Sequence, residues 1–114
     1  MVVYIDIYRY NINMDKIFKA LADKNRRKIL TLLKDKNLSV NELLTNFEIG
    51  QATLSSHLSI LKKANLVKNE IKGKQRIYRL NKDLLFAFAE NMRRFVGKID
   101  NTLVDVIAIR GQKV

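Results

Sequence analysis

Small polar side chains and lysines gather on one face of an expected helix that follows Ile49. At about 100° per residue this face carries Ala52, Ser55, Ser56, Ser59, Lys62 and Lys63. Leu54, Leu58 and Leu61 recur on the opposite face and predict its burial. Hydroxyls and lysines on a closely approaching helix can bind base edges and phosphates in a DNA major groove, which is about 12 Å wide. A plain surface helix with a chance cluster of serines is the alternative.

Cations occur in two further places where an anion could bind. Arg26 stands in the first turn of an expected helix, where a positive charge opposes the helix dipole unless an external anion compensates it. For its neighbours Arg27 and Lys28 we favour an ordinary solvated face. Three more cations, Lys72, Lys74 and Arg76, surround Gly73 at the tip of an expected hairpin. We expect them to contact phosphates or the minor groove, and solubility alone is the other explanation.

His57 is the single histidine of the chain. A catalytic histidine needs an orienting carboxylate or a nucleophile, and a metal site needs three or four ligands. The sequence offers neither, nor a glycine-rich phosphate loop. We therefore expect no enzyme, no metal and no cofactor. His57 itself is expected to be partly buried, either hydrogen-bonded within the fold or donating to a phosphate.

The composition favours an anionic partner. The chain has 114 residues, with 22 Lys and Arg against 11 Asp and Glu, which gives a formal net charge of +11. Such a balance suits a phosphate-rich partner, and an anionic membrane surface would also satisfy it. No apolar run approaches the roughly 18 residues of a membrane span, and no signal-peptide pattern is present. We expect a cytoplasmic protein without a membrane partner. The absence of cysteine excludes disulfides and thiolate chemistry.

Capping signals divide the middle of the chain into short helices. Asn13 and Asp23 are expected N-caps of helices over 14–22 and 24–34. The run from Ser39 to Glu42 has the spacing of a capping box and predicts a short helix that buries Leu43, Leu44 and Phe47. After a turn over 48–50, Gly50 is the expected N-cap of the serine-rich helix. Two helices joined by such a turn form a helix-turn-helix.

Two extended runs, 66–72 and 74–80, are joined at Gly73 and predict a β-hairpin. A hairpin beside a helix-turn-helix is a wing. The sequence therefore predicts a mainly α (α+β) fold, a winged helix-turn-helix with a two-stranded wing, over residues 13–81.

A long helix is expected from Lys82 onward, capped by Asn81, with an apolar stripe too broad for one small domain to cover. The stripe continues through Ile109 past a possible break near Asp100. We expect residues 82–114 to form a dimerisation helix and tail, because twofold homodimers are the commonest oligomers. The expected interface residues are Ile17, Phe18, Leu85, Phe88, Met92, Phe95 and Ile99. The alternative is that the stripe folds entirely onto its own domain.

Residues 1–12 alternate apolar and polar side chains as a strand does. An added edge strand and a disordered tail both remain open for this N-terminal extension.

Several of these residues occur in motifs that resemble a known family. The segment 17–81 resembles the ArsR-type winged-helix transcriptional repressors. The matching motifs are Phe18-Lys19-Ala20-Leu21-Ala22-Asp23, Arg26-Arg27-Lys28-Ile29-Leu30, Ser55-Ser56-His57-Leu58-Ser59-Ile60-Leu61 and Gly73-Lys74-Gln75-Arg76-Ile77-Tyr78-Arg79-Leu80. The resemblance implies a homodimer that binds an inverted-repeat operator near its own gene and leaves DNA when an effector binds.

The chain also departs from that family. Metal-sensing members use cysteines at the start of the third helix or Asp, His and Glu sets on the last helix. Here the third helix reads Ser39-Val40-Asn41-Glu42-Leu43-Leu44, and no histidine follows residue 57. The chain is therefore most similar to the metal-independent, SdpR-like autorepressor branch, and its sequence identifies no effector.

The expected function is that of a regulator that binds double-stranded DNA through specific contacts. The residues expected to contact DNA are Gln51, Thr53, Ser55, Ser56, His57, Ser59, Lys62, Arg26, Lys72, Lys74 and Arg76. A winged-helix protein interaction module without specific DNA binding is the main alternative, and RNA binding is a weaker third because the sheet lacks an exposed aromatic pair. The salt dependence of duplex binding distinguishes the first two functions, because only a phosphate binder loses affinity for duplex DNA steeply as the salt concentration rises.

Overall fold

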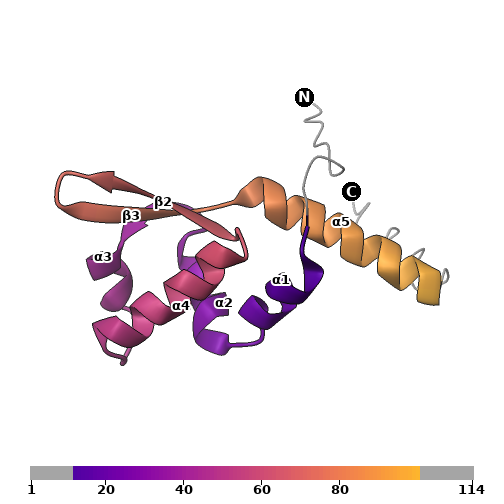
Figure 1. Cartoon of the computed structure of the whole chain (residues 1–114), viewed down its shortest axis with the longest axis horizontal. Helices are drawn as coiled ribbons and strands as arrows, with labels where there is room; N and C mark the ends of the chain where they lie inside the picture. The colour runs from indigo at the N-terminus through magenta and orange to yellow at the C-terminus, as the bar shows by residue number, and fades with distance from the viewer. Residues whose placement is uncertain (1–11, 101–114) are drawn as a thin grey trace, which may run out of the picture.

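The computed structural model describes residues 12–100, which form five helices and three strands within that range. In chain order these are α1 (Met14–Leu21), α2 (Lys24–Leu32), β1 (Leu38–Ser39), α3 (Val40–Leu44), α4 (Gln51–Lys63), β2 (Val67–Lys72), β3 (Gln75–Leu80) and α5 (Lys82–Ile99). The four shorter helices pack together, while the hairpin and α5 extend in opposite directions along the long axis (Figure 1). The winged helix-turn-helix fold is confirmed. The predictions for 1–11 and for the tail after residue 100 lie outside the described residues.

Every predicted helix start is confirmed. Side-chain oxygens of Asn13, Asp23, Ser39 and Asn81 each accept a hydrogen bond from a backbone N–H in the first turn of the following helix. These bonds satisfy donors that have no partner inside a helix. Gly50 precedes α4 with extended backbone and without a side-chain cap. The N-terminus of α4 is consequently the one start among these helices that lacks a side-chain cap.

The second helix is shorter than predicted. It ends at Leu32, and the backbone N–H of the following Leu33 donates to the carbonyl of Ile29. Leu33 is buried in the core, so the chain turns there and leaves Lys34 outside the helix. Apolar spacing alone includes Lys34 because it does not show where packing redirects the backbone.

The wing belongs to a three-stranded antiparallel sheet with the order β1-β3-β2. The third strand, β1, was missed from sequence because it has only two residues, and its Ser39 also caps α3. In the hairpin itself Lys72 pairs with Gln75, which leaves Gly73 and Lys74 as a two-residue turn. Gly73 has φ of +62°, which glycine adopts without strain. Lys74 therefore lies in the turn and not, as predicted, in the second strand.

The core is built from the faces that the sequence pattern marked as apolar. It includes Leu54, Leu58 and Leu61 of α4 together with Ile29 and Leu30 of α2. The prediction for α3 was partly wrong, because Leu43 is fully buried whereas Leu44 and Phe47 are half-buried at the edge.

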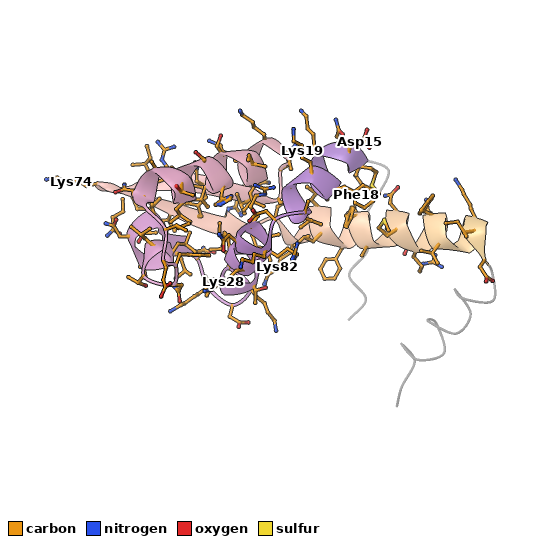
Figure 2. The ribbon with its side chains drawn as sticks, turned by 90° about the horizontal axis from the view of Figure 1, so that it is seen from below. Asp15, Phe18, Lys19, Lys28, Lys74 and Lys82 are labelled. Carbon is orange, nitrogen blue, oxygen red and sulfur yellow. The ribbon has the colours of Figure 1, made fainter. Side chains whose placement is uncertain are left out.

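The long helix α5 leaves the core after its first two turns. Its buried residues are Leu84 and Ala87, neither of which was predicted to be an interface residue. Further along, Phe88 meets Phe18 of α1 edge-on, with ring centroids 5.6 Å apart. Figure 2 shows Phe18 between α1 and α5. Phe95 and Ile99 are 54% and 69% exposed, so residues 12–100 leave this part of the predicted apolar stripe uncovered.

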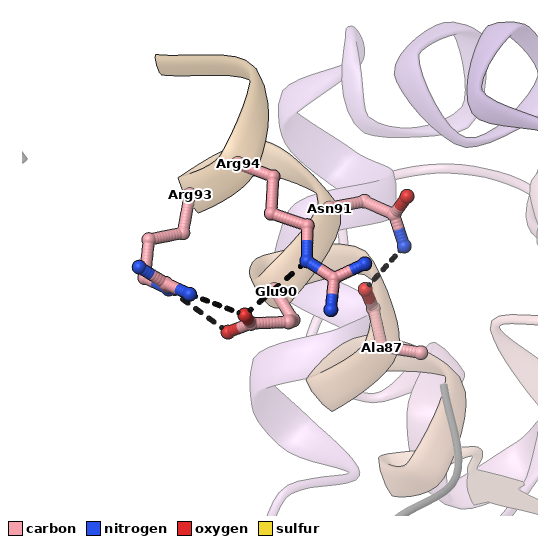
Figure 3. Close-up of polar contacts among 5 residues, drawn as sticks. All are labelled: Ala87, Glu90, Asn91, Arg93 and Arg94. Atoms are coloured by element: carbon pink, nitrogen blue, oxygen red, sulfur yellow. Dashed lines mark hydrogen bonds and ion pairs between the residues drawn. The ribbon is translucent and has the colours of Figure 1, made fainter. Parts of the chain in front are cut away.

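The opposite side of α5 is held by local ion pairs (Figure 3). Glu90 accepts two hydrogen bonds from Arg93, at 2.6 and 3.0 Å, and lies 3.6 Å from Nε of Arg94. The Arg93 hydrogen bonds lower the pKa of Glu90, and Glu90 in turn raises the pKa of Arg93. Such pairs three and four residues apart stabilise a solvent-exposed helix modestly.

Candidate nucleic-acid interface

A groove of about 360 Å³ separates α4 from the wing. It is lined by Val40, Gln51, Ser55, Ser59, Lys62, Asn69, Arg76 and Tyr78. None of these residues is acidic, and Lys62 and Arg76 place a cation on each wall. The groove thus combines hydroxyl, amide and cationic groups, which are the groups that bind base edges and phosphates.

The positions of the apolar residues explain how the groove forms. Because Leu54, Leu58 and Leu61 are buried, the helix must turn Ser55 and Ser59 away from the core. On the wing, Tyr78 and Arg76 alternate with Ile77, so both project from one face of β3. Burial of one face of α4 and the alternation of side chains along β3 together place these residues on the two walls of the groove.

A smaller hollow of about 220 Å³ continues this surface toward the wing tip. It is lined by Ser39, Val40, Asn41, Gln51, Lys74, Gln75 and Arg76. Val40, Gln51 and Arg76 line both hollows, so the two hollows adjoin. Lys74 stands at the far end of the molecule (Figure 2).

Three of the residues expected to contact DNA lie on the other flank of α4. Thr53, Ser56 and His57 do not line the groove, although Thr53 and Ser56 are exposed. The hydroxyl of Ser56 donates to the carbonyl of Ala52 at 3.1 Å, which occupies its proton.

Arg26 has a structural role that its sequence position did not reveal. Its Nε donates to the carbonyl of Ala20 at 2.7 Å and a terminal nitrogen donates to that of Lys19 at 3.0 Å. Its other terminal nitrogen lies 3.3 Å from Nδ1 of His57. Three of the five guanidinium N–H directions are therefore used inside the fold. His57 is half-buried and lies within hydrogen-bond distance of Arg26, which agrees with the first of the two expectations for it, while donation to a phosphate stays a prediction.

The other cations of this turn also bind carbonyls. Arg27 donates to the carbonyl of Leu21 at 2.7 Å, and Lys28 donates to that of Asn46 at 2.6 Å. The ammonium of Lys28 also lies 4.7 Å from the centre of the Phe47 ring. Both side chains are exposed, and these contacts give them partners within the protein without an external anion, in line with the solvated face that we favoured.

Asp23 is the carboxylate next to this cluster. Desolvation alone would raise its pKa, but hydrogen bonds from the backbone N–H groups of Arg26 and Asn25, and the charges of His57 and Arg26, outweigh it. The pKa of Asp23 therefore lies below its ordinary value of 3.8. An ionised Asp23 partly balances Arg26, which further reduces the need for an external anion.

On the wing, Lys72 forms an ion pair with Glu70, with a distance of 3.4 Å between Nζ and Oε1. Both side chains are more than half exposed, so the pair contributes little stability. Strand alternation places these two residues on the face opposite Arg76.

Sequence reasoning missed Val40, Asn69 and Tyr78 as groove residues. Asn69 pairs with Tyr78 across the hairpin, and its buried Nδ2 has no hydrogen-bond partner. The sequence could have indicated Asn69 as a groove residue, because strand alternation places it on the same face of β2 as Val67 and Ile71.

Comparison with known proteins identifies the family. The profile of "Bacterial regulatory protein, arsR family" matches residues 23–69. The Transcriptional repressor SdpR of Bacillus subtilis is 38% identical over 90 residues, which are 79% of this chain and the whole of that protein. The chain belongs to the ArsR family of bacterial regulatory proteins.

A second regulator and a solved structure also resemble this chain in sequence and in fold. The HTH-type transcriptional regulator Rv2034 of Mycobacterium tuberculosis is 36% identical over 81 residues, covering 71% of this chain and 76% of that protein. The solved ArsR-like Transcriptional Regulator from Rhodococcus sp. RHA1 superposes with a TM-score of 0.71 at 27% identity, covering 84% and 91% of the two chains. As a member of the ArsR family, this chain is a DNA-binding transcriptional regulator and not an enzyme.

Two further properties of the described residues concern a metal site and a membrane span. Across residues 12–100, no three His, Cys, Asp or Glu side chains come together in a way that could hold a metal ion. In the same range no helix is long and apolar enough to span a membrane.

Proposed function

We propose that this protein is a repressor of transcription, acting in the cytoplasm as a homodimer on an inverted-repeat operator, and that it represses its own gene. The observation that carries the proposal is the groove between α4 and the wing, with Ser55 and Ser59 on one wall and Arg76 on the other. The relative from Bacillus subtilis is itself named a transcriptional repressor. Double-stranded DNA is the partner, and no effector is assigned.

The groove divides the DNA contacts between bases and backbone. Gln51, Ser55 and Ser59 lie on the flank of α4 that faces the groove and would approach base edges in the major groove. Thr53 and Ser56, on the other flank, would contact the adjacent strand. Lys62 and Arg76 would bind the phosphates that enter the groove, and Lys74 would bind those at the wing tip. Lys72 would contribute less because Glu70 already pairs with it.

The exposed apolar stripe supports the dimer. Phe88, Met92, Phe95 and Ile99 lie along one side of α5, and an apolar face of this length is unusual on a soluble monomer. Next to it, a hollow of about 410 Å³ lies between α1 and α5, lined by Met14, Phe18, Asn91, Met92, Arg94, Phe95 and Lys98. A second copy would cover both features. Leu85 is half-buried at the start of the same stripe.

Ile17 must be removed from the proposed interface. Its side chain is 1% exposed and belongs to the core of its own protomer. Helical spacing grouped it with Phe18, but adjacent residues on a helix point about 100° apart. Phe18, which is 45% exposed, is the residue of α1 that a partner can reach.

Dimerisation would be part of the recognition mechanism. One protomer presents a single recognition helix, α4. A twofold dimer can place two copies of α4 about 34 Å apart, which is one turn of DNA. That spacing matches two half-sites of an inverted repeat. The same dimer also doubles the number of phosphates that are bound.

The test is to select duplexes from a random pool with the purified protein and to sediment the protein with and without the selected duplex. The proposal predicts an inverted repeat with half-site centres about one helical turn apart, bound by two protomers. It also predicts a dimer without DNA. A selected site without twofold symmetry, bound by one protomer, would reject the dimeric mechanism and retain only DNA binding.

A further inference from the structure

Ile71 is an exposed apolar residue beside the polar tip of the wing. Its side chain is 69% exposed although isoleucine is normally buried. It pairs with Arg76 across the hairpin, so both side chains project from the same face. Val67, Asn69 and Ile71 share that face along β2 by strand alternation. Ile71 thus continues the groove wall of the wing outward, toward the end of the hairpin.

The order of elements across this surface matches the order of features across a DNA duplex. The helix α4 comes first, then the groove with Lys62 and Arg76 on its walls, and then the outer part of the wing with Ile71. On DNA, a major groove is followed by a phosphate strand and then by a minor groove. With α4 in the major groove and the phosphate strand in the cationic groove, the tip of the wing reaches the minor groove.

We propose that Ile71 enters the minor groove beside each half-site and makes the protein prefer A·T pairs there. The inference rests on the proposed function and adds a specificity-determining residue to it. Apolar side chains occur at minor-groove contacts of DNA-binding proteins. A·T pairs present only acceptors in the minor groove, whereas guanine adds its N2 amino group. An isoleucine against that amino group would remove it from water without offering an acceptor, which is unfavourable.

The charges around Ile71 fit this placement. Arg76 lies beside it on the same face, and Lys74 stands in the turn beyond it. The opposite face carries Lys68, Lys72 and Arg79 beside Glu70, so charge alone does not distinguish the two faces. Ile71 is placed toward DNA because it shares its face with Asn69 and Arg76, which line the groove.

Base analogues distinguish rejection of the guanine N2 amino group in the minor groove from recognition of base edges in the major groove. In the duplex selected by the protein, each A·T pair is replaced in turn by G·C and by inosine·C, and the equilibrium affinity is measured. Inosine resembles guanine in the major groove but lacks the N2 amino group in the minor groove. A pair read in the major groove loses affinity with both replacements. At a pair contacted by Ile71 we expect a loss of about fivefold or more with G·C and recovery with inosine·C.

The Ile71→Thr variant tests the assignment, because threonine keeps a β-branched side chain suited to a strand. We expect it to reduce the G·C loss at these pairs to near zero while the major-groove positions are unchanged. Lys68→Thr is the matched control, since Lys68 is exposed on the other face of β2. It should leave the preference intact. Thermal unfolding of both variants confirms that the hairpin is folded.

The outcomes are distinguishable from those of the proposed function. If no A·T pair shows loss with G·C and recovery with inosine·C, or if Ile71→Thr keeps the pattern, the inference is wrong while DNA binding stands. If the protein binds no duplex even at low salt, both the inference and the proposed function are wrong.

Discussion

A terminal nitrogen of Arg26 lies 3.3 Å from Nδ1 of His57, which connects the first turn of α2 to α4 across 31 positions of sequence. Arginine has no acceptor, so in a hydrogen bond between these two groups Nδ1 of His57 is the acceptor. The same guanidinium binds the carbonyls of Lys19 and Ala20 at the end of α1. Arg26 therefore fixes the serine-rich helix relative to the helices that precede it.

This role predicts how Arg26 variants behave. Arg26→Ala should lower the free energy of unfolding by about 1–3 kcal/mol, because it leaves carbonyls and His57 without their donor. Arg26→Lys should be nearly as harmful, since an ammonium cannot reproduce the planar arrangement of donors. Denaturant unfolding with both variants measures this effect.

DNA binding distinguishes the structural role of Arg26 from a phosphate contact. Removing a structural arginine should weaken binding without changing the salt slope. Lys74→Ala, as a comparison, should reduce the slope by about 0.9 for each phosphate that Lys74 neutralises. An Arg26→Ala protein of normal stability with a reduced slope would show that Arg26 binds DNA instead.

The groove predicts unequal contributions from the serines of α4. Ser55→Ala and Ser59→Ala should each relax the preference at one operator position and cost about 1–3 kcal/mol of discrimination. Ser56→Ala is the comparison on the other flank, where the hydroxyl proton is already used by the carbonyl of Ala52. A backbone contact of Ser56 carries no sequence information, so this variant should leave the base preference unchanged. Competition binding with single-base operator variants is the measurement. Equal losses at all three positions would mean that the groove does not face the bases.

Two phenylalanines of α5 test the dimer under matched conditions. Phe95 and Phe86 are 54% and 60% exposed on the same helix but lie on different sides of it. Phe95→Glu should produce monomers with weak operator binding, while Phe86→Glu should remain dimeric. Because both positions are exposed, neither change should unfold the protomer. Sedimentation that found both variants dimeric would place the interface elsewhere.

The capping box predicts a pH effect on stability. The backbone N–H of Ser39 donates to Glu42 at 3.0 Å, and its hydroxyl accepts from the N–H of Glu42 at 3.1 Å. The hydrogen bond from the backbone N–H of Ser39, followed by an interaction with the Ser39 hydroxyl, lowers the pKa of the Glu42 carboxyl below its ordinary value of 4.5. A lowered carboxyl pKa gives stability that is present above pH 4.5 and lost as pH falls through the folded value.

The matched variant is Glu42→Gln, which keeps an oxygen acceptor and removes the titration. Chemical unfolding between about pH 6 and pH 3 should show a steeper loss of stability in the unmodified protein than in Glu42→Gln. Parallel curves would mean that the capping box does not depend on the charge of Glu42. Asp23 and Glu90 also have lowered pKa values, so the difference between the two curves is the quantity to compare.

The helix starts and the buried face of α4 could be predicted from sequence because both depend on neighbours close in the chain. Asn13, Asp23, Ser39 and Asn81 cap their helices through residues at most three positions away. Leu54, Leu58 and Leu61 need only helical periodicity.

Three of the misses involve contacts between distant segments. The strand formed by Leu38 and Ser39 exists only because β3 lies beside it. The burial of Ile17 and the anchoring of Arg26 likewise depend on helices that pack from elsewhere. The exposed residues of the α5 stripe follow from helical spacing, and the dimer that we propose to cover them is tested by the Phe95 variant.

The salt dependence of duplex binding tests the central proposal most directly. The affinity of the purified protein for its selected duplex, measured across a range of salt concentrations, should fall linearly on a double-logarithmic plot. The slope should be about −0.9 for each phosphate that the two protomers neutralise. Specific affinity should exceed that for a scrambled duplex at every salt concentration. A protein that binds neither duplex at low salt, or binds both without dependence on salt, would contradict a regulator that reads DNA through α4 and its basic wing.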